Sequence, residues 1–514
     1  VAVENYGYDQ PGSALTVTEQ GAYTTFSTTK ASRKQMLYVG ANDGMLHAIN
    51  AADTAASGGG QELFTYVPDA VIPNLKNLAS PTYQHQYFVD GSPNSGDAYL
   101  GGAWRTVLLG TLGAGGKAVF ALDITDPDAF DASKVMWEYT DTSGDLGNIM
   151  GRAFVARMND GNWYAVFGNG YNSANQHAVL YMVPLDKALG LPVIKIDTGV
   201  GTDNGLSEPA LLDTNGDRII DTIYAGDLRG NVWKFDVSGS NSSSATAWKI
   251  AYKSGSTDTP LFQAKIGTTE QPITSPLEIG AAPSGQSGYM IYFGTGKYLG
   301  NTDIGPTNTQ TGYGILDSGS KISNGRSDLQ GQSFVYEGPY SATNSDVVRV
   351  VSTTAFSYSG GSAKKGWYLD LLSPNTPTNL GERIVSVPLL RYGRVIFTSI
   401  VPSAAVCDQG GYSWLTEVDA FSGAGLPYSV FDFNSDTLFN SSDYVSYTTS
   451  GTTQNSAVSG KKLASQGLLK SPTVISAGDV EYKVGSGTAG GIVVVSEKGT
   501  TGSPRTSWRQ LFPQ

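Results

Sequence analysis

Cysteine is almost absent from this 514-residue chain, because Cys407 is the only one. A single cysteine excludes an internal disulfide framework and a thiolate zinc cluster. Histidine is nearly as scarce, and no two of His47, His85 and His177 stand at the spacing of a zinc site. His47 lies within a strand pattern, so we interpret it as a packed or hydrogen-bonded residue and not as a general base.

Positive charge is also in short supply. The chain has 33 Lys and Arg residues against 45 Asp and Glu, a formal net charge of −12. A nucleic-acid partner is therefore not expected, since binding a polyanion needs a basic patch, whereas acidic side chains favour cations. No apolar run approaches the ~20 residues of a transmembrane segment, and no signal peptide follows Val1. We interpret Val1 as the start of a processed or excised fragment.

What the sequence does contain is typical of an all-β protein. Glycine accounts for 64 residues, charged residues for only 15%, and short runs rich in Val, Ile, Tyr and Phe are cut by Gly, Asn, Asp and Ser. A strand, a glycine turn and a second strand recur in seven places. These predicted units are residues 36–50, 106–123, 163–186, 221–236, 290–317, 394–419 and 491–512. The first is the clearest, with Asn42, Asp43 and Gly44 as a hairpin turn.

One strand pair cannot bury both of its faces, so radial stacking of several sheets is the natural arrangement. Dividing 514 residues by seven gives about 73 per unit, more than the ~40–45 of a compact propeller repeat. We therefore predict one β-propeller domain over residues 1–514, with seven irregular blades, long loop insertions and a few short helices. A stacked solenoid is the structural rival. Residues 68–78 predict a short helix outside the sheets, and residues 448–459 predict a loop.

The strongest chemical motif is the acidic loop at residues 213–221. Side-chain oxygens stand at its positions 1, 3, 5 and 9, and position 7 can offer a backbone carbonyl; the five residues are Asp213, Asn215, Asp217, Asp221 and Ile219. Calcium prefers six to eight oxygen ligands, and alternate residues of a tight loop can converge on one such ion. Without an ion the clustered carboxylates would repel one another. The spacing therefore predicts a Ca²⁺ site at the edge of a sheet or between two sheets.

The loop departs from an EF-hand, because Arg218 replaces the glycine of position 6 and Tyr224 replaces the glutamate of position 12. A second acidic segment with similar oxygen spacing runs from Asp432 to Asp443, but Thr437 occupies the position where a sharp turn favours glycine. We interpret this second segment as a polar turn, with metal binding as the alternative.

Several segments resemble the C-terminal half of the PilC/PilY family of type IV pilus biogenesis factors and tip adhesins. They occur in order along the chain, as LYVGANDGMLHA at 37–48, YFVDGSP at 87–93, WRTVLLG at 104–110, GGKAVFALDI at 115–124, FGNGY at 167–171 and SWRQL at 507–511. That family is similar at residues 213–221 too, where it carries a nine-residue calcium loop of this kind.

The resemblance implies a non-enzymatic protein of the cell surface, at the pilus tip or associated with the outer membrane. The implied roles are pilus assembly, calcium-dependent control of extension and retraction in twitching motility, and adhesion in virulence. The implied partners are type IV pilus components such as minor pilins, together with host-cell surface receptors.

Two alternatives stay open. Quinone-dependent dehydrogenases are also large calcium-containing propellers, but many of them carry a disulfide between adjacent cysteines, which one cysteine cannot form. The eight tryptophans are better interpreted as packing between blades than as part of a cofactor site. A carbohydrate-binding propeller is the second alternative, and it would need exposed aromatic side chains.

Overall fold

The computed structural model describes residues 5–240, 247–305, 308–375, 379–405, 408–449 and 451–499. These residues form two compact units. The first takes up the chain as far as Leu228 together with Trp233–Thr259, and the second takes up Arg229–Val232 and the chain from Pro260 onward. No helix among the described residues is both long enough and apolar enough to cross a membrane.

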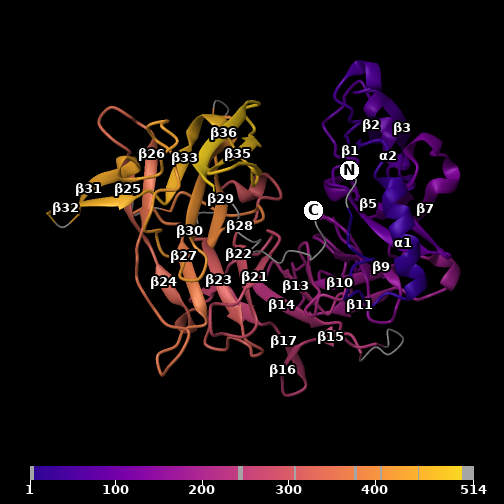
Figure 1. Ribbon diagram of the computed structural model, residues 1–514, viewed down its shortest axis with the longest axis horizontal. Coiled ribbons are helices and arrows are strands. Elements are labelled where there is room, and N and C mark those ends of the chain that lie inside the picture. The colour runs from indigo at the N-terminus through magenta and orange to yellow at the C-terminus, as the bar shows by residue number, and fades with distance from the viewer. Residues whose placement is uncertain are drawn as a thin grey trace. The chain divides into compact units, whose positions relative to one another are not determined.

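The first unit is built from antiparallel sheets of consecutive strands (Figure 1). The first sheet contains β1 (Met36–Gly40), β2 (Leu46–Asn50) and β3 (Glu62–Tyr66). The second contains β4 (Asn94–Leu100), β5 (Ala103–Thr111), β6 (Val119–Asp123) and β7 (Val135–Tyr139). The third contains β8 (Phe154–Arg157), β9 (Trp163–Gly168), β10 (Val179–Pro184) and β11 (Ile194–Asp197). The fourth contains β12 (Ala210–Leu212), β13 (Thr222–Gly226), β14 (Asn231–Asp236) and β15 (Lys249–Ile250); the first two residues of β14 belong to the second unit. The short β16 (Tyr252–Ser254) pairs with β17 (Thr257–Thr259).

The second unit has larger sheets whose strand order departs from chain order. One sheet has the order β21 (Glu278–Ala281), β22 (Tyr289–Gly294), β23 (Thr311–Asp317), β27 (Gly366–Asp370) and β24 (Gln330–Gln332), with β24 parallel to β27. The next has the order β25 (Phe334–Pro339), β26 (Val347–Val351), β33 (Gly460–Leu463), β30 (Gly411–Asp419), β29 (Arg394–Pro402) and β28 (Leu389–Arg391). The last contains β34 (Thr473–Ala477), β35 (Val480–Ser486) and β36 (Ile492–Lys498). The short strand β18 (Phe262–Gln263) pairs with Asn231 and Val232. Two further short pairs are β19 (Lys265–Ile266) with β20 (Thr269–Glu270), and β31 (Tyr444–Thr449) with β32 (Thr452–Ala457).

Each of the seven predicted strand units lies in a different one of these seven sheets. Six of them form adjacent antiparallel strand pairs, as predicted; β29 and β30 pair over nine residues each. In the seventh unit β36 pairs with β35 instead, and the rest of that unit, from residue 500, lies outside the described residues. Gly44 has a φ of +96° in the turn between β1 and β2, a conformation that favours glycine.

Helices are few. The stretch predicted at residues 68–78 is helical in three short pieces, η2 (Asp69–Val71), α2 (Ile72–Leu75) and η3 (Lys76–Ala79), and belongs to no sheet. Helix α1 (Val17–Lys30) was not predicted; it is rich in threonine and lies against β5 (Figure 1).

The prediction of a loop over residues 448–459 was wrong for its strand-forming part. Tyr444–Thr449 and Thr452–Ala457 pair as the hairpin β31–β32. Threonine and tyrosine favour strands, and this local preference outweighed the polar character that suggested a loop.

Each unit has its own apolar core. Trp104, Trp163 and Trp233 lie in the main core of the first unit, and Trp367 lies in a core of the second. All seven tryptophans among the described residues are buried, which confirms for them the interpretation as packing residues. The eighth, Trp508, lies outside the described residues.

Candidate metal centre

The predicted calcium loop connects two neighbouring strands of one sheet. Asp213 follows β12 directly, Asp221 precedes β13 directly, and Leu212 pairs with Thr222 at the base of the loop. Since β12 is the edge strand, the loop lies at the edge of a sheet, which was one of the two predicted placements.

Asp213 is the centre of the loop. Its side chain is almost fully buried, with a residue exposure of 2%. The Oδ1 atom accepts hydrogen bonds from the backbone N–H groups of Asn215, Gly216 and Asp217 at 3.1, 2.7 and 3.2 Å. The Oδ2 atom accepts from the N–H of Arg218 at 2.7 Å. To reach this carboxylate the chain turns tightly, with Gly216 at φ +83° and Arg218 at φ +74°.

The other predicted ligands surround Asp213 but are bonded within the loop. The Asn215 amide donates to Asp217 Oδ2 at 3.1 Å, and Asp217 Oδ1 accepts from the N–H of Ile219 at 2.9 Å. Asp221 Oδ2 accepts from the N–H and the hydroxyl of Thr214 at 2.9 and 2.6 Å. Burial raises the pKa of the Asp217 carboxyl, and the nearby charges of Asp213 and Asp221 raise it further. The three carboxylates thus lie close enough to feel one another's charge.

Three neighbours of the loop were not predicted. Asn159 donates its side-chain amide to the carbonyl oxygens of Ile220 and Val237 at 2.9 and 3.1 Å, which anchors the end of the loop. From the N-terminal segment, Ala14 donates its N–H to the carbonyl of Asp217 at 2.9 Å. Arg218 donates its Nε–H to the carbonyl of Gly7 at 3.3 Å. Strand periodicity could not reveal these contacts, because their partners are far away in the sequence.

The donor types of the loop fit calcium, but its side chains are not gathered around one point. Among the described residues, no group of three or more His, Cys, Asp or Glu side chains is placed so that it could hold a metal ion. In the loop, the Asn215 and Asp217 side chains bond to each other. To bind an ion there, the Asn215 and Asp217 side chains would have to give up this mutual bond.

The second acidic segment repeats much of this geometry. The N–H of Thr437 donates to Asp432 Oδ2 at 3.1 Å, and the Asn434 amide donates to Asp436 Oδ2 at 2.8 Å. Asp443 is fully buried and accepts from the N–H of Phe433 at 2.9 Å. Thr437 stands at the position where a sharp turn favours glycine, and it has a φ of +62°. This segment is a tight polar turn, as the preferred interpretation held, and metal binding there stays an untested alternative.

His47 is hydrogen-bonded, as predicted. Its two ring nitrogens contact the carboxylates of Asp43 and Glu62, and the side chain is 22% exposed. The hydrogen bond to Glu62 is the largest cause of the raised pKa of His47, although burial opposes it. Both nitrogens are thus bonded to carboxylates, and neither nitrogen is open to act as a base.

Comparison with known proteins gives a consistent result. The family profile described as the PilY1 beta-propeller domain matches residues 7–366. A type IV pilus biogenesis factor PilY1 homolog of Xylella fastidiosa is 41% identical over 436 residues, which cover 82% of this chain and 28% of the relative. The PilY1 biogenesis factor of Pseudomonas aeruginosa is 35% identical over 486 residues, which cover 89% of this chain and 40% of the relative.

The fold comparison agrees. The crystal structure of the Pseudomonas aeruginosa PilY1 C-terminal domain aligns with a TM-score of 0.74 and 31% identity, covering 94% of this chain and 98% of that one. The predicted all-β propeller class is therefore confirmed. The chain spans well under half the length of the two curated relatives, whose names describe type IV pilus biogenesis factors. This chain belongs to the PilY1 family of type IV pilus biogenesis factors.

Proposed function

We propose that this chain is the C-terminal β-propeller of a type IV pilus biogenesis factor that acts at the cell surface, at the pilus tip or the outer membrane. The observation that carries the proposal is the 41% identity to a PilY1 homolog over 82% of the chain. The expected partners are type IV pilus components such as minor pilins. Adhesion to host-cell surface receptors, with a part in virulence, is a further role of the same surface protein.

The loop at residues 213–221 is the calcium site of this domain. The side-chain oxygens of Asp213, Asn215, Asp217 and Asp221 and the carbonyl oxygen of Ile219 are the ligands. Three carboxylates and two neutral oxygens match the preference of calcium for hard oxygen donors. When bound, the ion supplies positive charge that offsets the repulsion among the three carboxylates.

Calcium binding in the loop can also affect the rest of the domain through hydrogen bonds. The carbonyl of Asp217 and the side chain of Arg218 are bonded to the N-terminal segment at Ala14 and Gly7. An ion that fixes the loop also fixes these contacts, and a pilus partner that binds this segment becomes sensitive to calcium. In this way calcium controls extension and retraction in twitching motility, and with them surface attachment.

The test compares two matched substitutions in the gene that encodes the chain. Asp217→Asn and Asp436→Asn each remove one carboxylate from corresponding positions of the two acidic loops. We expect deletion of the gene to abolish surface pili, and Asp217→Asn to alter the number of surface pili and the twitching zone at equal protein level. Asp436→Asn should match the unmodified strain.

The two halves of the proposal fail separately. If the deletion strain keeps its surface pili and twitches normally, the chain is not a biogenesis factor. If the deletion strain loses its pili but Asp217→Asn behaves as the unmodified strain with and without calcium, the loop has no regulatory role.

A further inference from the structure

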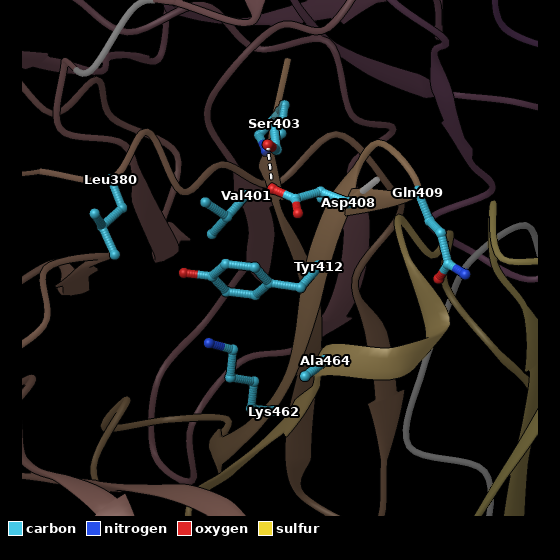
Figure 2. Close-up of a pocket in the computed structure, with 10 residues that line it drawn as sticks. Leu380, Val401, Ser403, Asp408, Gln409, Tyr412, Lys462 and Ala464 are labelled. Atoms are coloured by element: carbon cyan, nitrogen blue, oxygen red, sulfur yellow. Dashed lines mark hydrogen bonds between the residues drawn. The ribbon is translucent and has the colours of Figure 1, made fainter. Parts of the chain in front are cut away.

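A pocket of about 510 Å³ lies in the second unit, where the end of β29 meets the start of β30 and the end of β33. Its volume is within the range of ~300–1,000 Å³ that is usual for sites of small ligands. Figure 2 shows the residues that line it. None of them belongs to the acidic loops described above, so the pocket raises a separate question.

Tyr412 and Lys462 form one wall of the pocket. Trp414 of β30 pairs with Lys462 of β33, and Tyr412 stands two residues from Trp414, so side-chain alternation brings Tyr412 and Lys462 to the same face of the sheet. The Lys462 ammonium lies 3.7 Å from the centre of the Tyr412 ring. Figure 2 shows the Tyr412 hydroxyl and the Lys462 ammonium at the same side of the pocket, with Leu380 beyond them.

The ammonium of Lys462 lacks an anionic partner. Across the part of the chain that the structure describes, no carboxylate lies within ion-pair distance of it. The carboxylates of Glu337 and Glu382 act on Lys462 only beyond ion-pair distance, and they are paired with the buried Arg349 at 2.7 and 2.8 Å. Burial lowers the pKa of Lys462, which reflects the cost of holding this charge away from water. A half-buried cation and a hydroxyl donor therefore face the same space.

The rest of the pocket offers an apolar surface and a second polar group. Leu380 and Val401 are aliphatic, and Asp408 accepts a hydrogen bond from the Ser403 hydroxyl at 2.6 Å. Asp408 keeps capacity for further donors, because an ionised carboxylate has about four acceptor positions. Its negative charge also disfavours a ligand with two negative charges, such as a phosphate monoester.

We propose that this pocket binds a ligand that carries a single carboxylate, which accepts hydrogen bonds from the Lys462 ammonium and the Tyr412 hydroxyl. Hydroxyl or amide donors of the same ligand bond to Asp408, and its carbon frame lies against Leu380 and Val401. An acidic sugar and the C-terminal carboxylate of a peptide both have this chemistry. The inference does not depend on calcium binding by the loop at residues 213–221.

The test is isothermal titration of the chain with three acids and their methyl esters. The acids are N-acetylneuraminic acid, glucuronic acid and N-acetylalanyl-leucine; the first two represent sugars and the third a peptide terminus. We expect at least one acid to bind about tenfold or more tightly than its ester, because the ester loses a charge-assisted hydrogen bond. The acids that bind identify the source of the carboxylate.

Variants then assign the contact. Lys462→Met keeps the aliphatic stem over the Tyr412 ring and should weaken acid binding by about tenfold or more. Tyr412→Phe keeps the ring and should weaken it by a smaller factor. Lys470→Met removes the same charge from an exposed position outside the pocket and should change nothing.

Three results would overturn the proposal: esters that bind as tightly as the acids, Lys462→Met binding the acids as the unmodified chain does, or no acid binding below about 10 mM. The Tyr412→Phe variant keeps the test decisive if Lys462→Met fails to fold, since unchanged acid binding by Tyr412→Phe alone contradicts the assigned hydrogen bond.

Discussion

At the scale of single residues, the second unit buries an unusual number of charges. Glu417 and Glu497 are fully buried next to Arg394 and Lys483, which lie 3.3 Å from Glu417 and 2.8 Å from Glu497 respectively. Burial and the neighbouring charge of Glu417 raise the pKa of Glu497 well above its usual value. Burial also opposes ionisation of Glu417, but the charge of the neighbouring Arg394 lowers its pKa overall. The pKa values of the two neighbouring carboxyls are therefore shifted in opposite directions.

The raised pKa of Glu497 makes the stability depend on pH. Glu497 holds its proton to a higher pH in the folded state than in the unfolded chain, which loses it above about pH 4.5, so the free energy of unfolding falls as pH rises through this window, by at most about 1.4 kcal/mol per unit. Glu497→Gln has a similar shape and no proton to lose. We therefore expect the stability of the unmodified chain to fall more steeply with pH than that of Glu497→Gln. Urea unfolding of both proteins from about pH 5 to about pH 8 measures this difference in slope. Parallel pH profiles of the two proteins would contradict the raised pKa of Glu497.

At the scale of elements, the strands were predictable and helix α1 was not. The strands were recognisable in the sequence from alternating apolar residues that end at glycine turns, as at Gly44. The sequence of α1 is rich in threonine, which has weak helix propensity, so no helical pattern was evident. The available signal was local: Thr16 and Glu19 form a capping box, in which each side chain bonds to the backbone N–H of the other residue.

The capping box gives a prediction at this scale. Thr16→Ala removes the hydroxyl that accepts from the N–H of Glu19, which should lower the free energy of unfolding by about 1 kcal/mol. Thr25→Ala makes the same change at an exposed position of α1 and should have an effect within about 0.5 kcal/mol. Urea unfolding of both variants measures the difference. Equal stabilities would mean that the box does not hold the start of α1.

The candidate sites were predictable only where their residues are close together in the sequence. Oxygen spacing identified residues 213–221, because the ligands of such a loop are close in sequence. The bonds of Asp217 and Arg218 to Ala14 and Gly7 were out of reach, since they join segments about 200 residues apart. The pocket was equally hidden, because Tyr412 and Lys462 meet only when β33 pairs with β30 across the intervening hairpin β31–β32.

At the scale of the whole molecule, the chain has an all-β propeller fold, for which we propose one cation site at residues 213–221. The net charge of −12 argues against a nucleic-acid partner, and the family relationship supplies the pilus context. Seven sheets matched the seven predicted units because each strand pair is a local feature. That residues 1–514 form one propeller domain stays a prediction.

The central claim is that the loop at residues 213–221 binds calcium, and isothermal titration of the whole chain with calcium tests it most directly. We predict one ion per chain, an affinity lowered about tenfold or more by Asp217→Asn because one of three carboxylate ligands is neutralised, and an unchanged affinity in Asp436→Asn. If Asp217→Asn binds calcium with the stoichiometry and affinity of the unmodified chain, or if Asp436→Asn is the variant that loses binding, the claim is contradicted.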